Sequence, residues 1–243
     1  MTEEPYRWLE AISNRREYVT EQLKSGSPVF AASLADGILL LGVGSGQSKV
    51  FELHDREAMA ALGHPADIEK LRQAAVDAAH VESFTRAAED VTLRRLVSFN
   101  LSARVKQEFE QLFTAPFLTE ILFAELGNSR AEDVLVALHF DGGFQFLSDG
   151  VGAVAPDGER AAEAQAWLVA HKLSEQPRKE AGMLMLRAWW RLTTERSFGD
   201  DIPVEEITAG VQKALEGKTL EIGWLKRDHD RAARYEELAV DSL

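Results

Sequence analysis

The stretch that most constrains the fold runs from Gly26 to Gly42 and reads GSPVFAASLADGILLLG. It holds two apolar runs, Val29–Leu34 and Ile38–Leu41, joined by the dipeptide Asp36-Gly37. An Asp-Gly pair between apolar runs is the strongest short-range signal for a β-hairpin, because both central residues of the tight turn need positive φ. The stretch therefore predicts two antiparallel strands near the start of the chain.

Residues 5–24, before this hairpin, have the pattern of a helix. Apolar residues fall at helical spacing while charged residues lie mostly elsewhere, and Ser25-Gly26 is a suitable stop. The apolar face consists of Trp8, Ile12, Val19 and Leu23. On pattern alone this is a surface helix that packs on its own domain.

The residues after the hairpin predict a flexible loop, a second strand pair and two long helices. The loop is 42–48, and the strands are Lys49–Leu53 and Ala58–Leu62. Gly63-His64-Pro65 breaks the pattern, and a helix then starts near Ala66, because proline fits a first helical turn. Its face is Ile68, Leu71, Ala75 and Ala79.

A second long helix is predicted from about Asp90, a suitable N-cap, to Pro116. The residues of its apolar face are Leu93, Leu96, Val97, Leu101, Val105, Phe109 and Leu112. Antiparallel strands follow at Leu118–Leu126, Val134–Phe140 and Phe144–Leu147, then helices at 159–173, 178–196 and 203–216, and a last strand at Leu220–Leu225.

Long helices grouped between hairpin-linked strands favour antiparallel sheets covered by helices over an alternating parallel fold. We therefore expect an α+β protein in which two stacked antiparallel sheets lie between helical layers. Without an internal repeat or a low-complexity linker, residues 1–243 are expected to form one domain, with 1–25 as an N-terminal helix and 26–243 as the sandwich.

The composition excludes several classes of protein. A net charge of −13 argues against nucleic acid or an anionic membrane as the general partner. The absence of cysteine excludes a disulfide framework and thiolate metal sites, and the histidines have no i, i+4 pair. The N-terminus lacks the pattern of a secretory signal, and no apolar run approaches the length of a membrane span. We expect a cytoplasmic protein without a metal or cofactor.

Ordered motifs over residues 5–238 resemble α-type proteasome subunits, from the family whose catalytic members are N-terminal-nucleophile hydrolases. The motifs are LKSGSPVF (23–30), the ADG turn (35–37), SKVFELHD (48–55), AALGHPADIEKLRQAA (60–75), FDGGFQF (140–146) and LEIGWLKRDHDRAARYEEL (220–238). The charged first helix and the last motif look most like bacterial members. The resemblance implies a four-layer αββα sandwich and heptameric rings that stack on rings of catalytic β-type subunits.

The same resemblance implies that this subunit has no peptidase activity of its own within a threonine-type protease complex. Catalytic members use the amine and hydroxyl of an N-terminal threonine, helped by an acid and a lysine. Here Ser27 stands at the position of the threonine and Val43 at that of the acid, whereas Lys49 fills that of the lysine. Val43 supplies no charge, so the catalytic set is degenerate.

In α-type subunits the matching lysine binds the C-terminal carboxylate of ring-shaped ATPase activators in a pocket between neighbouring subunits. The resemblance therefore implies that Lys49 is a docking residue and that Gly26 forms the pocket edge, where its backbone can approach a peptide closely. The other interpretation of Lys49 is an ordinary exposed lysine at the start of a strand.

Two alternatives to a ring-forming, gating subunit stay open. One is a hydrolase that becomes active after processing to Ser27, or through Thr2 once the initiator Met is removed. The other is an orphan oligomer of the same fold without a β-type partner or a peptidase role. GVGSGQSK (42–49) fits no phosphate-binding pattern, because Gln47 stands where a glycine is needed.

Overall fold

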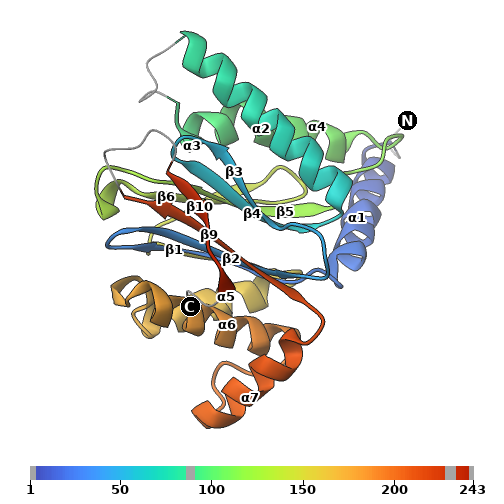
Figure 1. Cartoon of the computed structure of the whole chain (residues 1–243). Coiled ribbons are helices and arrows are strands. Elements are labelled where there is room, and N and C mark those ends of the chain that lie inside the picture. The colour runs from blue at the N-terminus through green and yellow to red at the C-terminus, as the bar shows by residue number, and fades with distance from the viewer. Residues whose placement is uncertain (1–3, 86–90, 228–233, 241–243) are drawn as a thin grey trace.

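The structure is a computed structural model that describes residues 4–85, 91–227 and 234–240. Two antiparallel sheets are stacked face to face, and helices cover the outer face of each (Figure 1). The expected α+β fold, a four-layer αββα sandwich, is confirmed. Thr2, Asp90 and residues 228–233 of the basic C-terminal segment lie outside the described residues.

The first sheet is built around the predicted hairpin. Phe30 pairs with Leu41 and Leu34 with Gly37, which confirms the hairpin, but its turn lies one residue earlier than predicted. The two turn residues are Ala35 and Asp36, Asp36 does not adopt positive φ, and Gly37 already belongs to β2. Within the described residues the strand order is β10-β9-β2-β1-β8. The strands are β1 (Val29–Leu34), β2 (Gly37–Gly44), β8 (Val151–Val154), β9 (Thr219–Lys226) and β10 (Tyr235–Glu237).

The second sheet has consecutive strands in the order β3-β4-β5-β6-β7. Short turns join its neighbours, except that the long helices lie between β4 and β5. The strands are β3 (Val50–His54), β4 (Glu57–Gly63), β5 (Thr119–Glu125), β6 (Val134–Leu138) and β7 (Phe144–Leu147). The second strand pair and the later hairpins are therefore confirmed within a few residues.

Alternation along the strands divides the apolar side chains among three cores. In β1, Val29 and Ala31 point into the core between the sheets, whereas Phe30 and Leu34 point into the core beneath the helices of the first sheet. A third core lies between the second sheet and its helices. Strands with both faces covered read as continuous apolar runs, which explains VFAASL and ILLLGVG.

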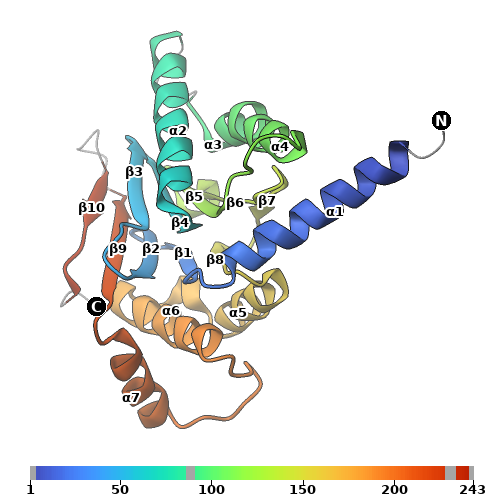
Figure 2. The same cartoon turned by 90° about the vertical axis from the view of Figure 1, so that its right-hand side faces the viewer.

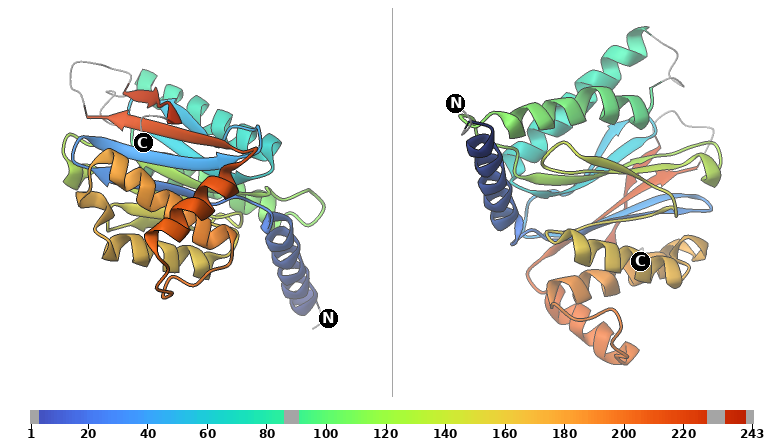
Figure 3. Two further views of the ribbon diagram at one scale, coloured as in Figure 1. Left: turned by 60° about the horizontal axis from the view of Figure 1, so that its bottom comes forward. Right: turned by 180° about the vertical axis from the view of Figure 1, so that it is seen from behind.

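Two groups of helices form the outer layers, which Figure 3 shows from two further directions. The helices α5 (Gly158–Ala170), α6 (Arg178–Thr193) and α7 (Val204–Leu215) cover the first sheet, and α2 (Pro65–Thr85), α3 (Leu93–Arg95), the π-helical segment η2 (Leu96–Leu101) and α4 (Ser102–Glu110) cover the second. Trp189 and Trp190 on α6 are both buried in the core of the first sheet.

The helix predicted from Asp90 to Pro116 is correct in its face but not in its length or regularity. The residues from Leu93 to Phe109 on that face are buried, but the helix ends at Glu110 and Leu112 is 37% exposed. The backbone N–H of Ser102 donates to the carbonyl of Val97, an i→i−5 bond typical of a π-helix. Apolar spacing alone does not reveal such a bulge.

Three strand predictions need correction. β2 continues to Gly44, so Val43 belongs to the strand and the predicted 42–48 loop is shorter. β6 ends at Leu138 instead of Phe140. β8 and β10 were not predicted, because runs of four and three residues are too short to carry a period and form only by pairing with β1 and β9.

The first helix, α1 (Glu4–Leu23), buries its apolar side chains in the sandwich at its C-terminal end. Val19 and Leu23 are buried, but Trp8 is 45% and Leu9 is 58% exposed. Figure 2 shows the N-terminal half extending away from the sandwich. The predicted apolar face is thus only half used within this chain.

One buried ion pair joins the two sheets at their turn end. The Arg227 guanidinium, at the end of β9, donates to both Asp133 carboxylate oxygens, at 2.9 and 2.8 Å. It also donates to the carbonyls of Gly127 and Ala35. Ser33 of β1 donates its hydroxyl to Asp133 over 2.6 Å. The pair therefore links the hairpin of the first sheet to the segment that precedes β6 of the second.

A second buried charge cluster lies under the helices of the second sheet. Glu57 and Glu125 are directly opposite each other on β4 and β5, and they are 2% and 7% exposed. Glu125 accepts the backbone N–H of Leu93 at the start of α3 over 2.7 Å, whereas neither Glu57 carboxylate oxygen has a partner within the described chain. Burial, with the Glu125 carboxylate, raises the pKa of Glu57 to about 8.

Removing the buried partner of Arg227 should destabilise the fold. Asp133→Ala leaves a buried guanidinium without its carboxylate, and we expect the free energy of unfolding to fall by about 3–5 kcal/mol. The matched control is Glu163→Ala, which breaks the partly exposed Arg160–Glu163 pair and should cost less than about 1 kcal/mol. Urea unfolding checks both variants, and equal losses would contradict the role of the buried pair.

Glu57 should make the protein less stable as the pH rises. The unfolded chain releases this proton near pH 4.5 and the folded chain near 8, so the unfolding free energy falls between these values by up to about 1.4 kcal/mol per pH unit. Glu57→Gln should flatten this slope and stabilise the protein at pH 8. Urea unfolding from pH 5.5 to 8.5 tests it, with the exposed Glu17→Gln as control. A slope unchanged by Glu57→Gln would show that this carboxyl does not titrate as expected.

Candidate functional site

The residues singled out from the sequence meet at one cavity of about 470 Å³. Gly26, Ser27, Val43 and Lys49 all line it. The cavity lies where α1 ends and β1 begins, beside the loop from β2 to β3 and the start of α2. The sequence motifs therefore come together in space, although they are up to 23 positions apart in the chain.

Lys49 is placed by two glycines of β2. A Cβ atom on Gly42 would lie 3.1 Å from Lys49 Cβ, and one on Gly44 would lie 3.5 Å from Lys49 Cε. The aliphatic stem of the lysine thus runs along the β2 backbone, where a side chain on Gly42 would crowd it. At Gly44 the nearest obstacle to a Cβ atom is the carbonyl oxygen of Gln47, at 2.9 Å.

Glu221 of β9 holds the segment that carries Lys49. Its Oε2 accepts the backbone N–H groups of Lys49 and Val50 over 2.8 and 3.1 Å. Burial lowers the pKa of Lys49, and the Glu221 carboxylate opposes this shift. Glu221 could not be identified from the sequence, because its partners are 171 and 172 residues away.

Gly26 lies at the edge of the cavity in close contact with its surroundings. Its N–H donates to the carbonyl of Leu23 over 2.7 Å, which ends α1. A Cβ atom on Gly26 would lie 2.9 Å from that carbonyl oxygen and 3.0 Å from Leu62 Cδ1. A side chain at this position would therefore need a rearrangement, and the glycine leaves its backbone open to the cavity.

Ser27 and Val43 are engaged in contacts with the α6 layer. The Ser27 hydroxyl accepts a hydrogen bond from Trp189 Nε1 over 2.9 Å. Val43 is fully buried in the core beneath α6 and α7, on the opposite face of β2 from the Lys49 stem. Among the residues that the structure describes, no Asp or Glu side chain lines this cavity. The arrangement offers a cation and a hydroxyl, but no carboxylate to serve as the acid.

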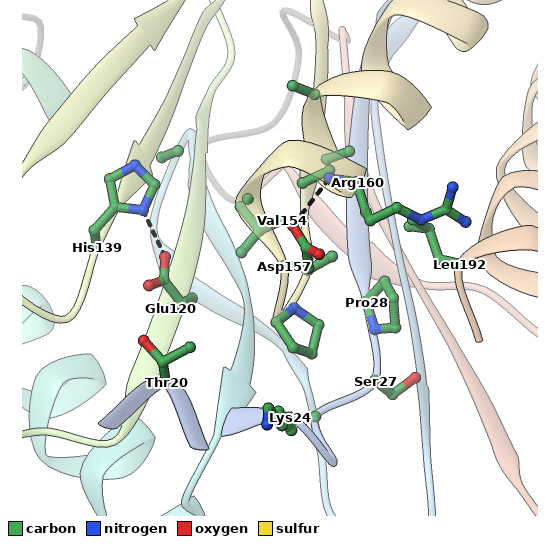
Figure 4. A pocket seen from close by; sticks show the side chains of 18 of the residues that line it. Thr20, Lys24, Ser27, Pro28, Glu120, His139, Val154, Asp157, Arg160 and Leu192 are labelled. Carbon is green, nitrogen blue, oxygen red and sulfur yellow. Dashed lines mark hydrogen bonds and ion pairs between the residues drawn. The ribbon is translucent and has the colours of Figure 1, made fainter. Parts of the chain in front are cut away.

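A larger open groove of about 1300 Å³ adjoins this cavity between α1, β6, β7 and α5. Figure 4 shows Glu120 and His139 next to each other on one side of it, with His139 Nδ1 2.6 Å from Glu120 Oε2. The Glu120 hydrogen bond raises the pKa of His139. Asp157 accepts the N–H groups of Glu159 and Arg160 and so caps α5. Glu120 and His139 thus contact each other, and Asp157 bonds to backbone N–H groups. None of these three residues was identified from the sequence.

The described ranges contain no group of three or more His, Cys, Asp or Glu residues that could hold a metal ion. None of their helices combines the length and the apolar character needed to cross a bilayer.

Comparison with known proteins gives relatives with one description. The chain is 36% identical over 136 residues to the proteasome subunit alpha of Pseudarthrobacter chlorophenolicus, covering 54% of this chain and 56% of that protein. It is 32% identical over 155 residues to that of Renibacterium salmoninarum, covering 62% and 61%. It is 28% identical over 225 residues to that of Kineococcus radiotolerans, covering 90% and 87%.

The chain thus spans between half and two thirds of the first two relatives and most of the third. No protein-family model matches it.

The charge of the Glu221 carboxylate should keep the pKa of Lys49 higher than it would be without that charge. Glu221→Gln keeps an oxygen that can accept the two N–H groups but removes the charge, so we expect the pKa of Lys49 to fall below its value in the unchanged protein. Acylation of Lys49 followed by peptide mass spectrometry over a pH series measures this, with exposed Lys179 as the internal reference. A Lys49 titration that does not move would contradict the electrostatic role of Glu221.

Proposed function

Because the chain belongs to the family of bacterial proteasome α-type subunits, we propose that it is a non-catalytic subunit of a proteasome-like protease. In this proposal it forms heptameric rings in the cytoplasm, which stack on rings of catalytic β-type subunits and gate the entry of protein substrates. The cavity at Lys49 and Gly26 docks the C-terminal tail of a ring-shaped ATPase.

The observation that carries the docking role is the charge of the cavity. Lys49 lines a recess without a carboxylate among the described residues, and its stem is fixed between Gly42 and Gly44. A partly buried ammonium is a suitable partner for a peptide carboxylate, because a hydrogen bond to a charged group contributes roughly 1.5–3 kcal/mol. The open backbone at Gly26 lets a peptide approach the same recess.

The non-catalytic role is supported by the two degenerate positions. Ser27 is an internal residue whose hydroxyl is bound by Trp189, and Val43 is a buried apolar side chain. An N-terminal nucleophile at Ser27 would require loss of α1, whose end supplies Val19 and Leu23 to the core between the sheets. Among the described residues that line the cavity, no carboxylate is present to serve as the acid that the hydrolase alternative needs.

Ring formation is supported by the projecting half of α1. Trp8 and Leu9 are exposed on a helix that stands away from its own chain. Large apolar side chains presented in this way suit a contact with a neighbouring copy, and a head-to-tail contact of one kind closes into a ring. An orphan oligomer would share this contact, and co-purification with a β-type subunit separates the two proposals.

We expect Lys49→Met to weaken docking without changing assembly. The probes are fluorescent Gly-Ser peptides that end in Ala-Leu, either as the free carboxylate or as the carboxamide. Loss of one charged hydrogen bond should weaken binding of the carboxylate peptide by about tenfold or more, as measured by anisotropy. Native mass spectrometry should give the same assembly for both proteins.

Lys179→Met, which changes an exposed lysine outside both cavities, is the control and should bind like the unchanged protein. Equal binding of the carboxylate and carboxamide peptides to the unchanged protein would rule out the docking role of Lys49.

A further inference from the structure

The cavity at Lys49 has a second cationic residue that the sequence motifs do not include. Lys218 lines it from the segment between α7 and β9, and His64 lines it at the start of α2. The charged side chains among its described lining are therefore the two lysines, in a chain whose net charge is −13. A recess of one sign in a protein of the other sign concentrates anions of matching shape.

The strand register brings the two lysines to the same place. Thr219 pairs with Gly44 across β9 and β2, so Lys218 follows directly beyond the end of this pairing. The Lys49 stem lies against the same Gly44, with Cε 3.5 Å from the position of a Cβ atom. The backbone of Lys218 and the stem of Lys49 therefore both lie near the end of β2, although the two residues are far apart in the sequence.

The head group of Lys218 is held beside Ser27. Its Nζ lies 5.0 Å from the ring centroid of Trp189, within the range of a cation–π contact. The same indole donates to the Ser27 hydroxyl, which lines the cavity. Because Ser27 accepts from Trp189, its own proton can be donated to a ligand. Among the described residues no hydrogen bond uses that proton.

We propose that Lys218 and the Ser27 hydroxyl form a second anion subsite next to Lys49, so that the cavity selects a peptide tail with an acidic side chain beside its C-terminal carboxylate. The inference rests on the proposed docking function and adds its specificity. Charge complementarity argues for this occupant: a tail with one carboxylate can neutralise only one of the two lysines that line the cavity. A second carboxylate neutralises the other lysine and accepts a hydrogen bond from the Ser27 hydroxyl.

The test compares two tails that differ by one charge. Fluorescent Gly-Ser peptides ending in Glu-Leu or Gln-Leu, both with a free carboxylate, are titrated against the assembled full-length protein. Lys218 is exposed, so we expect the Glu-Leu peptide to bind about 3- to 10-fold more tightly, with a preference that shrinks at high salt. Lys218→Met should abolish this preference while the affinity for the Gln-Leu peptide stays the same.

Two further variants distinguish a charge effect from a change in packing. Lys218→Arg keeps the charge over Trp189 and should keep the preference, whereas Lys179→Met should behave as the unchanged protein. If the unchanged protein shows no preference, or if Lys218→Met retains it, the second subsite is wrong.

Lys49→Met reports separately on the docking function, because it should weaken the binding of both peptides and leave the ratio of their affinities unchanged. If Lys49→Met binds both tails normally, the docking function itself fails. A Lys49-dependent affinity with equal binding of both tails overturns only the subsite.

Discussion

The buried pair of Arg227 and Asp133 is the constraint on which the arrangement of the two sheets depends. A guanidinium that is bonded to a carboxylate and to backbone carbonyls on both sheets fixes how the first hairpin sits over the segment before β6. Such a pair is costly to desolvate, so its geometry allows little freedom. It acts together with the apolar core between the sheets, which favours contact but is less directional. With one end fixed, the register of β2 against β9 determines what meets at the other end.

At that other end the chain builds a cationic recess out of backbone positions. Gly42 and Gly44 make room for the Lys49 stem, Glu221 binds the N–H groups at the start of β3, and Thr219 pairs with Gly44. Glu221 Oε2 accepts two backbone N–H groups, so this side chain orients the segment at the start of β3. Its charge partly offsets the lowering of the Lys49 pKa by burial. The lining of the recess therefore has no carboxylate among the described residues, although Glu221 binds the segment that carries Lys49.

The sequence predicted the parts of this design that depend on local pattern. The first hairpin, the continuous apolar strands and the helix faces each occupy a short window, and each is present in the structure, with the hairpin turn one residue earlier than predicted. The four cavity residues could be grouped only through the family resemblance. Glu221, Lys218 and Trp189 could not be found, because their roles arise from β2–β9 pairing and from packing between residues more than 160 positions apart. The π-helical bulge, β8 and β10 were missed for the related reason that tertiary pairing decides them.

The hydrogen bond from Trp189 to Ser27 supports the proposed binding role of Ser27 and not a nucleophilic one. A nucleophile needs a base to take its proton and an acid nearby to fix the charges, and here the neighbours are an indole N–H and the buried Val43. The indole bond occupies an acceptor position of the hydroxyl and directs its proton elsewhere, and the indole face holds the Lys218 ammonium. Because Val43 carries no charge, it adds no negative side chain that would compete with an anionic ligand. In the proposed function, an uncharged residue at this position therefore suits both the missing peptidase activity and the binding of an anionic tail.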